Sequence, residues 1–168
     1  ELMSTGQWVR QDLNFVTNHD RNGVFHYLGT RGGTVPFTNP ARSGIVKVSL
    51  ADTSVIGHPE DIVGREPWNV ELVTSNEPGR HIAVDLGAGR KLCVSHYTIR
   101  HGWSSSTHSL RHWELQGSND ARLWETISAH AKDTSLDGAF ASASWPVQSR
   151  HCYQHLRIVQ TGRNESDS

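Results

Sequence analysis

The chain has 168 residues, of which 35% are hydrophobic and 20% charged, a composition typical of one globular domain rather than a disordered chain. Its 16 Lys and Arg balance 17 Asp and Glu, so no overall positive field attracts phosphate backbones and nucleic acid is not expected as a partner. No run approaches the ~18 apolar residues of a membrane span, and no secretory signal pattern stands at the start.

The first half of the sequence predicts few strands and long loops. Residues 24–28 have the aromatic and β-branched content of a short strand, and the glycine-rich segment 29–33 follows as a flexible loop. Residues 45–50 alternate apolar and polar side chains, the period of a strand with one face in the core and one in water. Turn-forming residues predominate over 51–80, so at most a short strand is expected there, near residues 70–73.

The second half carries stronger strand patterns. In residues 110–117, Trp113 and Leu115 share one face while the residues between them share the other. No long stretch has the 3.6-residue period of a helix, so we expect an all-β sandwich with minor helix. The predicted strands of this half are 81–87, 92–100, 110–117, 124–130 and 153–160.

Cys93 and Cys152 both lie within predicted strands. Secreted sandwich domains tend to carry disulfides while intracellular proteins keep thiols, so buried free thiols in a reducing compartment are the simpler interpretation. The sequence is also compatible with a disulfide between the two cysteines. The sequon Asn164-Glu165-Ser166 lies in a polar tail and is only weak support for secretion.

An ordered series of motifs runs from residue 84 to residue 164. In this order and spacing the series resembles the discoidin, or coagulation factor 5/8 type C, family, and is similar to its intracellular branch in HECT-type ubiquitin ligases and BTB-domain proteins. Upstream, Tyr27-Leu28-Gly29-Thr30 and Asn39-Pro40 match the same branch, so the resemblance covers residues 22–164. The motifs are VDLG at 84–87, HYTIRHG at 96–102, LRHWELQGSND at 110–120, Trp124, ASWP at 143–146 and LRIVQTGRN at 156–164.

The resemblance implies a galactose-binding-domain-like jelly-roll β-sandwich over residues 22–164, with residues 1–21 as an N-terminal extension that packs on it and 165–168 as a polar tail. Within it, Gly87 and Gly117 are expected to release the chain where strands end. The sequence departs from the family in two places. His81-Ile82-Ala83 stands where an aromatic residue is common, and the family's final strand is missing. Either the sequence is cut short, or residues 8–15 supply the missing partner strand.

Motifs for catalysis are absent from the sequence. It contains no Gly-x-Ser-x-Gly elbow, no His-Glu-x-x-His, no Walker loop and no Cys-x-x-Cys. His96, His101, His108 and His112 lie close in sequence, but closure of four metal ligands is not visible among them. We therefore expect a domain that is not an enzyme and that needs no cofactor or metal. The alternative, a histidine-based or metal-dependent hydrolase, would need ligands that converge in a pocket, and the sequence does not show them.

Two tryptophans in polar loops indicate a binding surface. Trp103 in residues 102–109 offers a stacking platform for a sugar, a peptide side chain or a lipid, unless it folds back on the core, and Trp68 is a similar case. If Arg65 or Arg31 lies beside Trp103, it would bind a carboxylate or phosphate. Arg100 and Arg111 are interpreted as structural ion-pair residues. The predicted ligand-binding residues are Arg31, Arg65, Trp68, His101, Trp103 and His108.

Two functions follow from these patterns. The resemblance implies a non-catalytic module, monomeric as an isolated domain, that presents end loops to a protein or peptide partner. It would recruit substrates or act as a scaffold within a cytoplasmic or nuclear ubiquitin-ligase-type protein. The alternative is an extracellular glycan-binding module that recognises carbohydrate through Trp, His and Arg. Free thiols would favour the first function, and a Cys93–Cys152 disulfide would favour the second.

Overall fold

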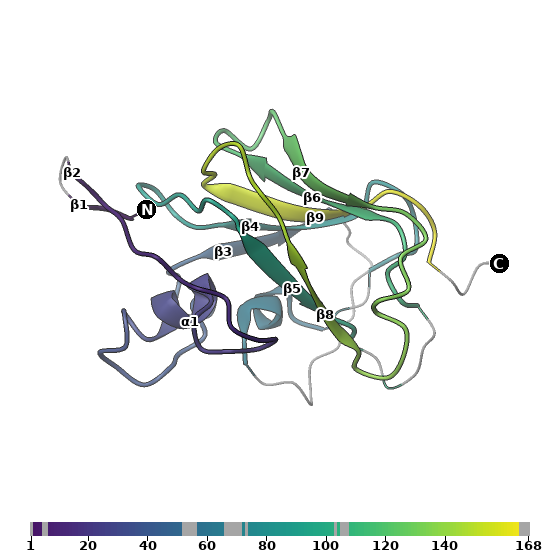
Figure 1. Ribbon diagram of the computed structural model, residues 1–168, viewed down its shortest axis with the longest axis horizontal. Coiled ribbons are helices and arrows are strands. Elements are labelled where there is room, and N and C mark those ends of the chain that lie inside the picture. The colour runs from purple at the N-terminus through teal and green to yellow at the C-terminus, as the bar shows by residue number, and fades with distance from the viewer. Residues whose placement is uncertain are drawn as a thin grey trace.

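A five-stranded antiparallel sheet in the order β3-β4-β9-β6-β7 forms one layer of the fold (Figure 1). The computed structural model describes residues 2–4, 7–51, 57–65, 72, 74–102, 104 and 108–164, and every structural statement below concerns these residues. The strands of this sheet are β3 (Lys47–Leu50), β4 (His81–Asp85), β6 (Trp113–Ser118), β7 (Glu125–His130) and β9 (His155–Gln160).

A two-stranded antiparallel sheet, β5 (His96–Arg100) with β8 (Ser142–Pro146), crosses the main sheet as the second layer (Figure 1). Mostly antiparallel strands with little helix make this a jelly-roll β-sandwich, which confirms the predicted fold class. The part of the chain that the structure describes contains no helix long and apolar enough to cross a membrane.

The predicted alternation places the core correctly. In β6, Trp113 and Leu115 are buried while Glu114 and Gln116 lie on the opposite, half-buried face. In β3, the exposed Lys47 and Ser49 alternate with half-buried residues, as a strand with one face in water requires. One group of buried side chains lies under β3 and β4, and consists of Leu28, Val46, Val63, Val84 and Leu86.

Residues 24–28 form a helix, not the predicted strand. Helix α1 spans Val24–Gly29 and places Val24, Tyr27 and Leu28 on one face against the core. These positions have the i, i+3, i+4 spacing of an apolar helical stripe, and that packing overrides the strand propensity of the aromatic residues. At Gly29 a Cβ atom would lie 2.5 Å from the Phe37 ring, so only glycine fits at this end of the helix.

Three further elements differ from the expectation. A 3-10 helix, η1 (Pro59–Val63), interrupts the long loop, and β8 was not predicted as a strand. The strand expected near residues 70–73 lies outside the described residues except for Leu72. Residues 8–15 were one of two alternatives for the missing family strand. In the described residues, β2 (Gln7–Val9) pairs with β1 (Leu2–Ser4) in a separate hairpin.

Gly117 has a different role from the predicted one. The strand continues past it to Ser118, and a Cβ atom at Gly117 would lie 2.4 Å from ring atoms of the buried Tyr153. Gly117 is therefore required for close packing of Tyr153 on β6. Gly87, in contrast, has a φ of +87° directly after β4, a left-handed conformation that glycine adopts at a turn.

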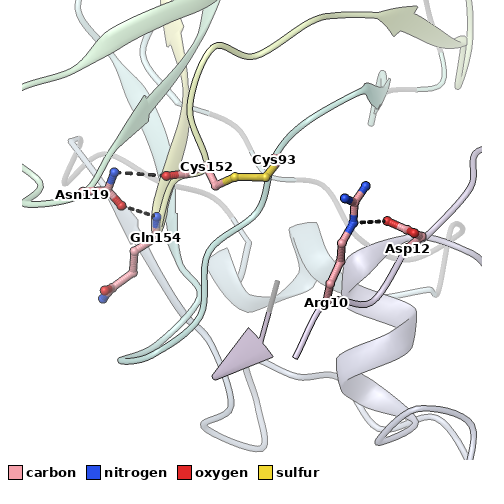
Figure 2. Close-up of a disulfide and its surroundings, with 6 residues drawn as sticks. All are labelled: Arg10, Asp12, Cys93, Asn119, Cys152 and Gln154. Atoms are coloured by element: carbon pink, nitrogen blue, oxygen red, sulfur yellow. Dashed lines mark hydrogen bonds and ion pairs between the residues drawn. A yellow bond between two sulfur atoms is a disulfide. The ribbon is translucent and has the colours of Figure 1, made fainter. Parts of the chain in front are cut away.

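The prediction of buried free thiols is wrong, because Cys93 and Cys152 form a disulfide (Figure 2). Cys93 is exposed and Cys152 is half-buried. Leu92 and Tyr153 pair as an antiparallel bridge, which sets the next residue of one segment opposite the preceding residue of the other. Sequence patterns could not give this register, and without it the proximity of the two cysteines was not visible.

Candidate functional site: a basic cluster at the end of β5 and β8

The N-terminal segment is held against β8 before it enters α1 (Figure 1). Asn18 Nδ2 donates a hydrogen bond to the carbonyl oxygen of Ser142 at 3.3 Å, and His19 Nε2 lies 2.6 Å from Oγ of the same serine. Ser142 is the strand partner of Arg100, the last residue of β5. The contact therefore brings His19 to the end of the strand pair where Arg100 stands.

A tight turn around Asp20 fixes this segment. The carboxylate of Asp20 accepts hydrogen bonds from the backbone amides of Val16 at 2.8 Å, Thr17 at 3.3 Å and Asn22 at 2.8 Å. Burial raises the pKa of Asp20, but the hydrogen bonds from these amides outweigh it and hold the pKa below its usual range. The negative charge of Asp20 is thus engaged by the backbone of its own turn.

Arg65 joins the same end of the sandwich from the segment after η1. Its Nη1 donates a hydrogen bond to the carbonyl oxygen of Asp20 at 3.4 Å, and its side chain is exposed. Among the described residues, Arg65 forms no ion pair with a carboxylate, and neither does the exposed Arg21.

Two histidines lie within the field of these arginines. Partial burial lowers the pKa of His19, and the positive charges of Arg100 and Arg65 lower it further. Burial also lowers the pKa of His26, again helped by Arg65 and then Arg21. The hydrogen bond from Arg65 to Asp20, and the pairing of Arg100 with Ser142, which contacts His19, connect these basic residues on a chain whose formal net charge is -1. We call the five residues the basic end cluster: His19, Arg21, His26, Arg65 and Arg100.

Aromatic rings border the basic end cluster on two sides. The His26 ring stacks on the half-buried Phe37 with ring centroids 5.8 Å apart. The guanidinium of Arg100 lies 5.6 Å from the centroid of Phe140, within cation–π range. Guanidinium and imidazole donors beside aromatic faces can bind an anionic or hydroxyl-rich group and pack against its apolar parts.

The predicted site residues fall in several places. Arg65 belongs to the basic end cluster, and His101 follows Arg100 directly but is buried, at 8% exposure. Arg31 is exposed in the turn after α1, and His108 is exposed in the segment between β5 and β6. The remaining two predicted residues, Trp68 and Trp103, lie outside the described residues.

Sequence reasoning missed most of the basic end cluster. Arg100 was interpreted as structural, and His19, Arg21 and His26 were not singled out. No local motif connects residues 19–26 with Arg65 and Arg100, because only the pairing of β5 with β8 and the Asp20 turn bring them together. The concentration of basic residues in His19-Asp20-Arg21 and at His26 was the one available signal.

A second polar arrangement lies between the sheets. His130 Nδ1 lies 2.8 Å from Asp133 Oδ2, and its Nε2 lies 2.7 Å from the Tyr97 hydroxyl and 2.9 Å from Ser128 Oγ. The order of acid, imidazole and hydroxyl is that of a hydrolase. However, the imidazole stacks on the fully buried Trp113, whose Nε1 donates to the Tyr97 hydroxyl at 3.2 Å. The geometry therefore supports a structural role, in which these hydrogen bonds link the two sheets.

The four histidines close in sequence are spread over the structure. Phe15 stacks on the exposed His96, while His112 Nδ1 accepts a long hydrogen bond from the Lys132 amide at 3.4 Å. Within the described ranges, no group of three His, Cys, Asp or Glu residues is placed to hold a metal ion.

Comparison with curated proteins relates the chain to two ubiquitin ligases and a BTB protein. It is 34% identical over 170 residues to E3 ubiquitin-protein ligase hecd-1 of Caenorhabditis elegans, covering 99% of this chain and 6% of the ligase. It is 34% identical over 156 residues to E3 ubiquitin-protein ligase Ufd4 of Drosophila melanogaster, covering 88% of this chain and 6% of the ligase. A BTB/POZ domain-containing protein of Arabidopsis thaliana is 28% identical over 160 residues, and the match covers 90% of this chain and 20% of that protein. No family model matches.

Solved structures with the same fold are carbohydrate-binding modules. The family 32 module of Clostridium perfringens NanJ, in complex with galactose, has a TM-score of 0.56 at 11% identity, covering 71% of this chain and 85% of that one. A second C. perfringens module, CpGH89CBM32-5 in complex with GalNAc-β-1,3-galactose, has a TM-score of 0.54 at 14% identity, covering 71% and 86%. At these identities the likeness establishes the fold.

The chain is therefore a galactose-binding-like β-sandwich domain. Its resemblance to the discoidin-type domains of ubiquitin ligases and BTB proteins is confirmed by the sequence relatives. The chain spans only about one seventeenth of each ligase it matches, since the matched segment is 6% of their length.

Proposed function

We propose that this domain is a non-catalytic binding module that recruits or scaffolds a protein partner for a larger, ubiquitin-ligase-type protein. The observation that carries the proposal is the match of almost the whole chain, at 34% identity, to a segment forming 6% of an E3 ligase. A segment of that size, with the fold of a binding module, is suited to select a partner while the transfer chemistry takes place elsewhere in the protein.

The proposed contact surface is the end of the sandwich that carries the basic end cluster. Arg65 and Arg21 are exposed there with no carboxylate partner among the described residues, which favours contact with a ligand over a structural role. We keep Arg31, His101 and His108 in the proposed binding set because they follow α1 and β5 in the chain, and we keep Trp68 and Trp103 on the sequence alone.

The proposed location is the cytoplasm or the nucleus, where the parent ligase would act. In a reducing compartment the Cys93–Cys152 disulfide would be open, and the hydrogen bonds between Leu92 and Tyr153, 2.9 and 3.0 Å long, would hold the two segments together. The domain would then work in its dithiol form.

A glycan-binding module is the second candidate function. Two observations favour it: the disulfide, which is typical of oxidising compartments, and the fold shared with modules solved in complex with galactose-containing ligands. Arginine and histidine donors beside aromatic faces would serve sugar hydroxyls as well as peptide groups.

The two functions are separated by parallel binding assays on a peptide library and a glycan array. The purified domain is compared with Arg65→Gln and Trp103→Ala, and with Arg122→Gln as a control in the exposed turn between β6 and β7. Peptide binding that is lost in the first two variants and kept in the control is the expected result. Glycan binding with the same dependence would replace the proposal by the lectin function.

A further inference from the structure

The basic end cluster specifies the chemical class of the ligand, an inference that rests on the proposed function. We propose that the cluster binds the carboxylate side chains of an acidic peptide segment in the partner protein. The cluster comprises three arginines and two histidines from the N-terminal segment, α1, the segment after η1 and the end of β5. The hydrogen bonds Arg65–Asp20 and His19–Ser142 and the pairing of Ser142 with Arg100 connect these segments.

Charge complementarity supports an acidic ligand. Asp20 is the carboxylate whose charge reaches His26, and its oxygens are occupied by the amides of Val16, Thr17 and Asn22. Among the described residues, Arg65 donates to a backbone carbonyl at the long distance of 3.4 Å, so a carboxylate of the ligand would be a stronger acceptor than this carbonyl. Binding would replace this weak contact by a charge-assisted one.

The surroundings favour a peptide segment over an isolated anion. Arg65 is joined to the Asp20 turn by its hydrogen bond, and Arg100 stands opposite Ser142, which contacts His19, so the basic groups are distributed over several segments. Phe37 stacks on His26 and Phe140 lies beside Arg100, so aromatic surface adjoins two members of the cluster. In a peptide with successive acidic residues and apolar neighbours, the carboxylates would bind the basic residues and the apolar side chains would pack on the aromatic rings.

Protonation of the two histidines should strengthen binding. His19 faces Arg100, Arg65 and the hydroxyl of Ser142, and His26 faces Arg65, Arg21 and Asp20. Their pKa values are lowered in the free domain, so both rings are mostly neutral at pH 7. A bound carboxylate favours the charged imidazole and raises both pKa values. By linkage, affinity for a peptide that stays ionised increases as the pH falls through these pKa values.

The test uses two labelled peptides that differ only in charge: one with Asp and Glu alternating with apolar residues, the other with Asn and Gln in their place. Binding is measured by fluorescence anisotropy between pH 5.5 and 7.5 and at two salt concentrations. The wild-type domain should bind the acidic peptide at least tenfold more tightly than the amide peptide. This preference should shrink with salt and grow toward pH 5.5.

Two double variants with the same charge change provide the control. Arg21→Gln/Arg65→Gln removes two exposed arginines from the cluster, and Arg122→Gln/Arg150→Gln removes two exposed arginines elsewhere. The first should lose about tenfold in affinity for the acidic peptide and the second less than about twofold, with circular dichroism showing both folded. Equal losses in both variants, or equal binding of the two peptides by the wild-type domain, would overturn the inference.

Failure of this inference is distinguishable from failure of the proposed function. If library peptides bind at the cluster without an acidic preference, the recruiting module stands and its ligand class is wrong. If the domain binds glycans and no peptide, both the proposed function and this inference are overturned.

Discussion

Nε2 of His19 lies 2.6 Å from Oγ of Ser142, and this contact attaches the N-terminal segment to the strand that pairs with β5. The segment thereby becomes part of the end of the sandwich and carries Arg21 and His26 to the same place as Arg100. The basic end cluster is therefore assembled from residues that lie up to about 80 positions apart in the sequence, from His19 to Arg100.

The Asp20 turn should position this surface, and Asp20→Asn separates geometry from charge. The substitution removes the charge of the acceptor that holds the amides of residues 16, 17 and 22, and it makes the cluster more positive by one unit. If positioning matters, affinity for an acidic peptide falls in spite of the added positive charge. A rise in affinity in the same anisotropy assay would show that net charge alone governs binding.

The hydrogen bonds of Tyr97 with Trp113 and His130, which link the two sheets, should contribute measurably to stability. Tyr97→Phe leaves Trp113 Nε1 without its acceptor and removes one of the two hydroxyl partners of His130 Nε2, the other being Ser128 Oγ, in a region where Trp113 is fully buried. We expect a loss of about 1–3 kcal/mol in the free energy of unfolding, measured with urea. Tyr27→Phe is the control, since the Tyr27 hydroxyl has no hydrogen bond within the described part of the chain and its loss should cost less than about 0.5 kcal/mol. Equal effects would contradict the assigned role.

Gly117→Ala should destabilise the domain by overpacking. The added methyl group would lie 2.4 Å from the ring of Tyr153, which is buried and bonded through its hydroxyl to Glu125. We expect a loss of about 1–3 kcal/mol in thermal or urea unfolding. Gly23→Ala, where nothing lies within 4 Å of the added atom, is the matched control and should be close to neutral. A neutral Gly117→Ala would show that β6 and β9 shift easily.

The disulfide should stabilise the domain without being required for its fold. Cys93 and Cys152 are 59 residues apart in sequence, and closing a loop of this length contributes about 2–4 kcal/mol. The double variant Cys93→Ser/Cys152→Ser should unfold at lower urea concentration but keep its strands. The side chain of Asn119, bonded to Cys152 O at 3.1 Å and to Gln154 N at 3.2 Å, still holds this region (Figure 2). Loss of the folded far-UV spectrum would contradict this expectation.

Strand patterns and the fold class could be predicted because alternation is local. Trp113 and Leu115 in β6, and Val84 in β4, are buried as the period of two required. Helix α1 could not be separated from a strand because it is a single short element, and only its packing against Leu86 and Val46 fixes the conformation. The ordered motifs carried the family resemblance because they mark turns and core tryptophans.

The site could be predicted only in part, since it depends on register and on the path of the N-terminal segment. The sequence singles out Arg65 because it precedes a tryptophan in a polar segment. The link from His19 to Arg100 passes through Ser142, and the disulfide depends on the pairing of Leu92 with Tyr153. Neither pairing leaves a signal in a single sequence.

Chemical-shift mapping tests the central claim most directly. The ¹⁵N-labelled domain is titrated with the tightest peptide from the library, and the perturbed backbone amides are assigned. The account predicts that the largest changes occur at residues 18–26, Arg65, Arg100 and 140–142, which surround the basic end cluster. Changes concentrated in the turn at residues 119–124 and around the disulfide would contradict it, because binding would then use the opposite end of the sandwich.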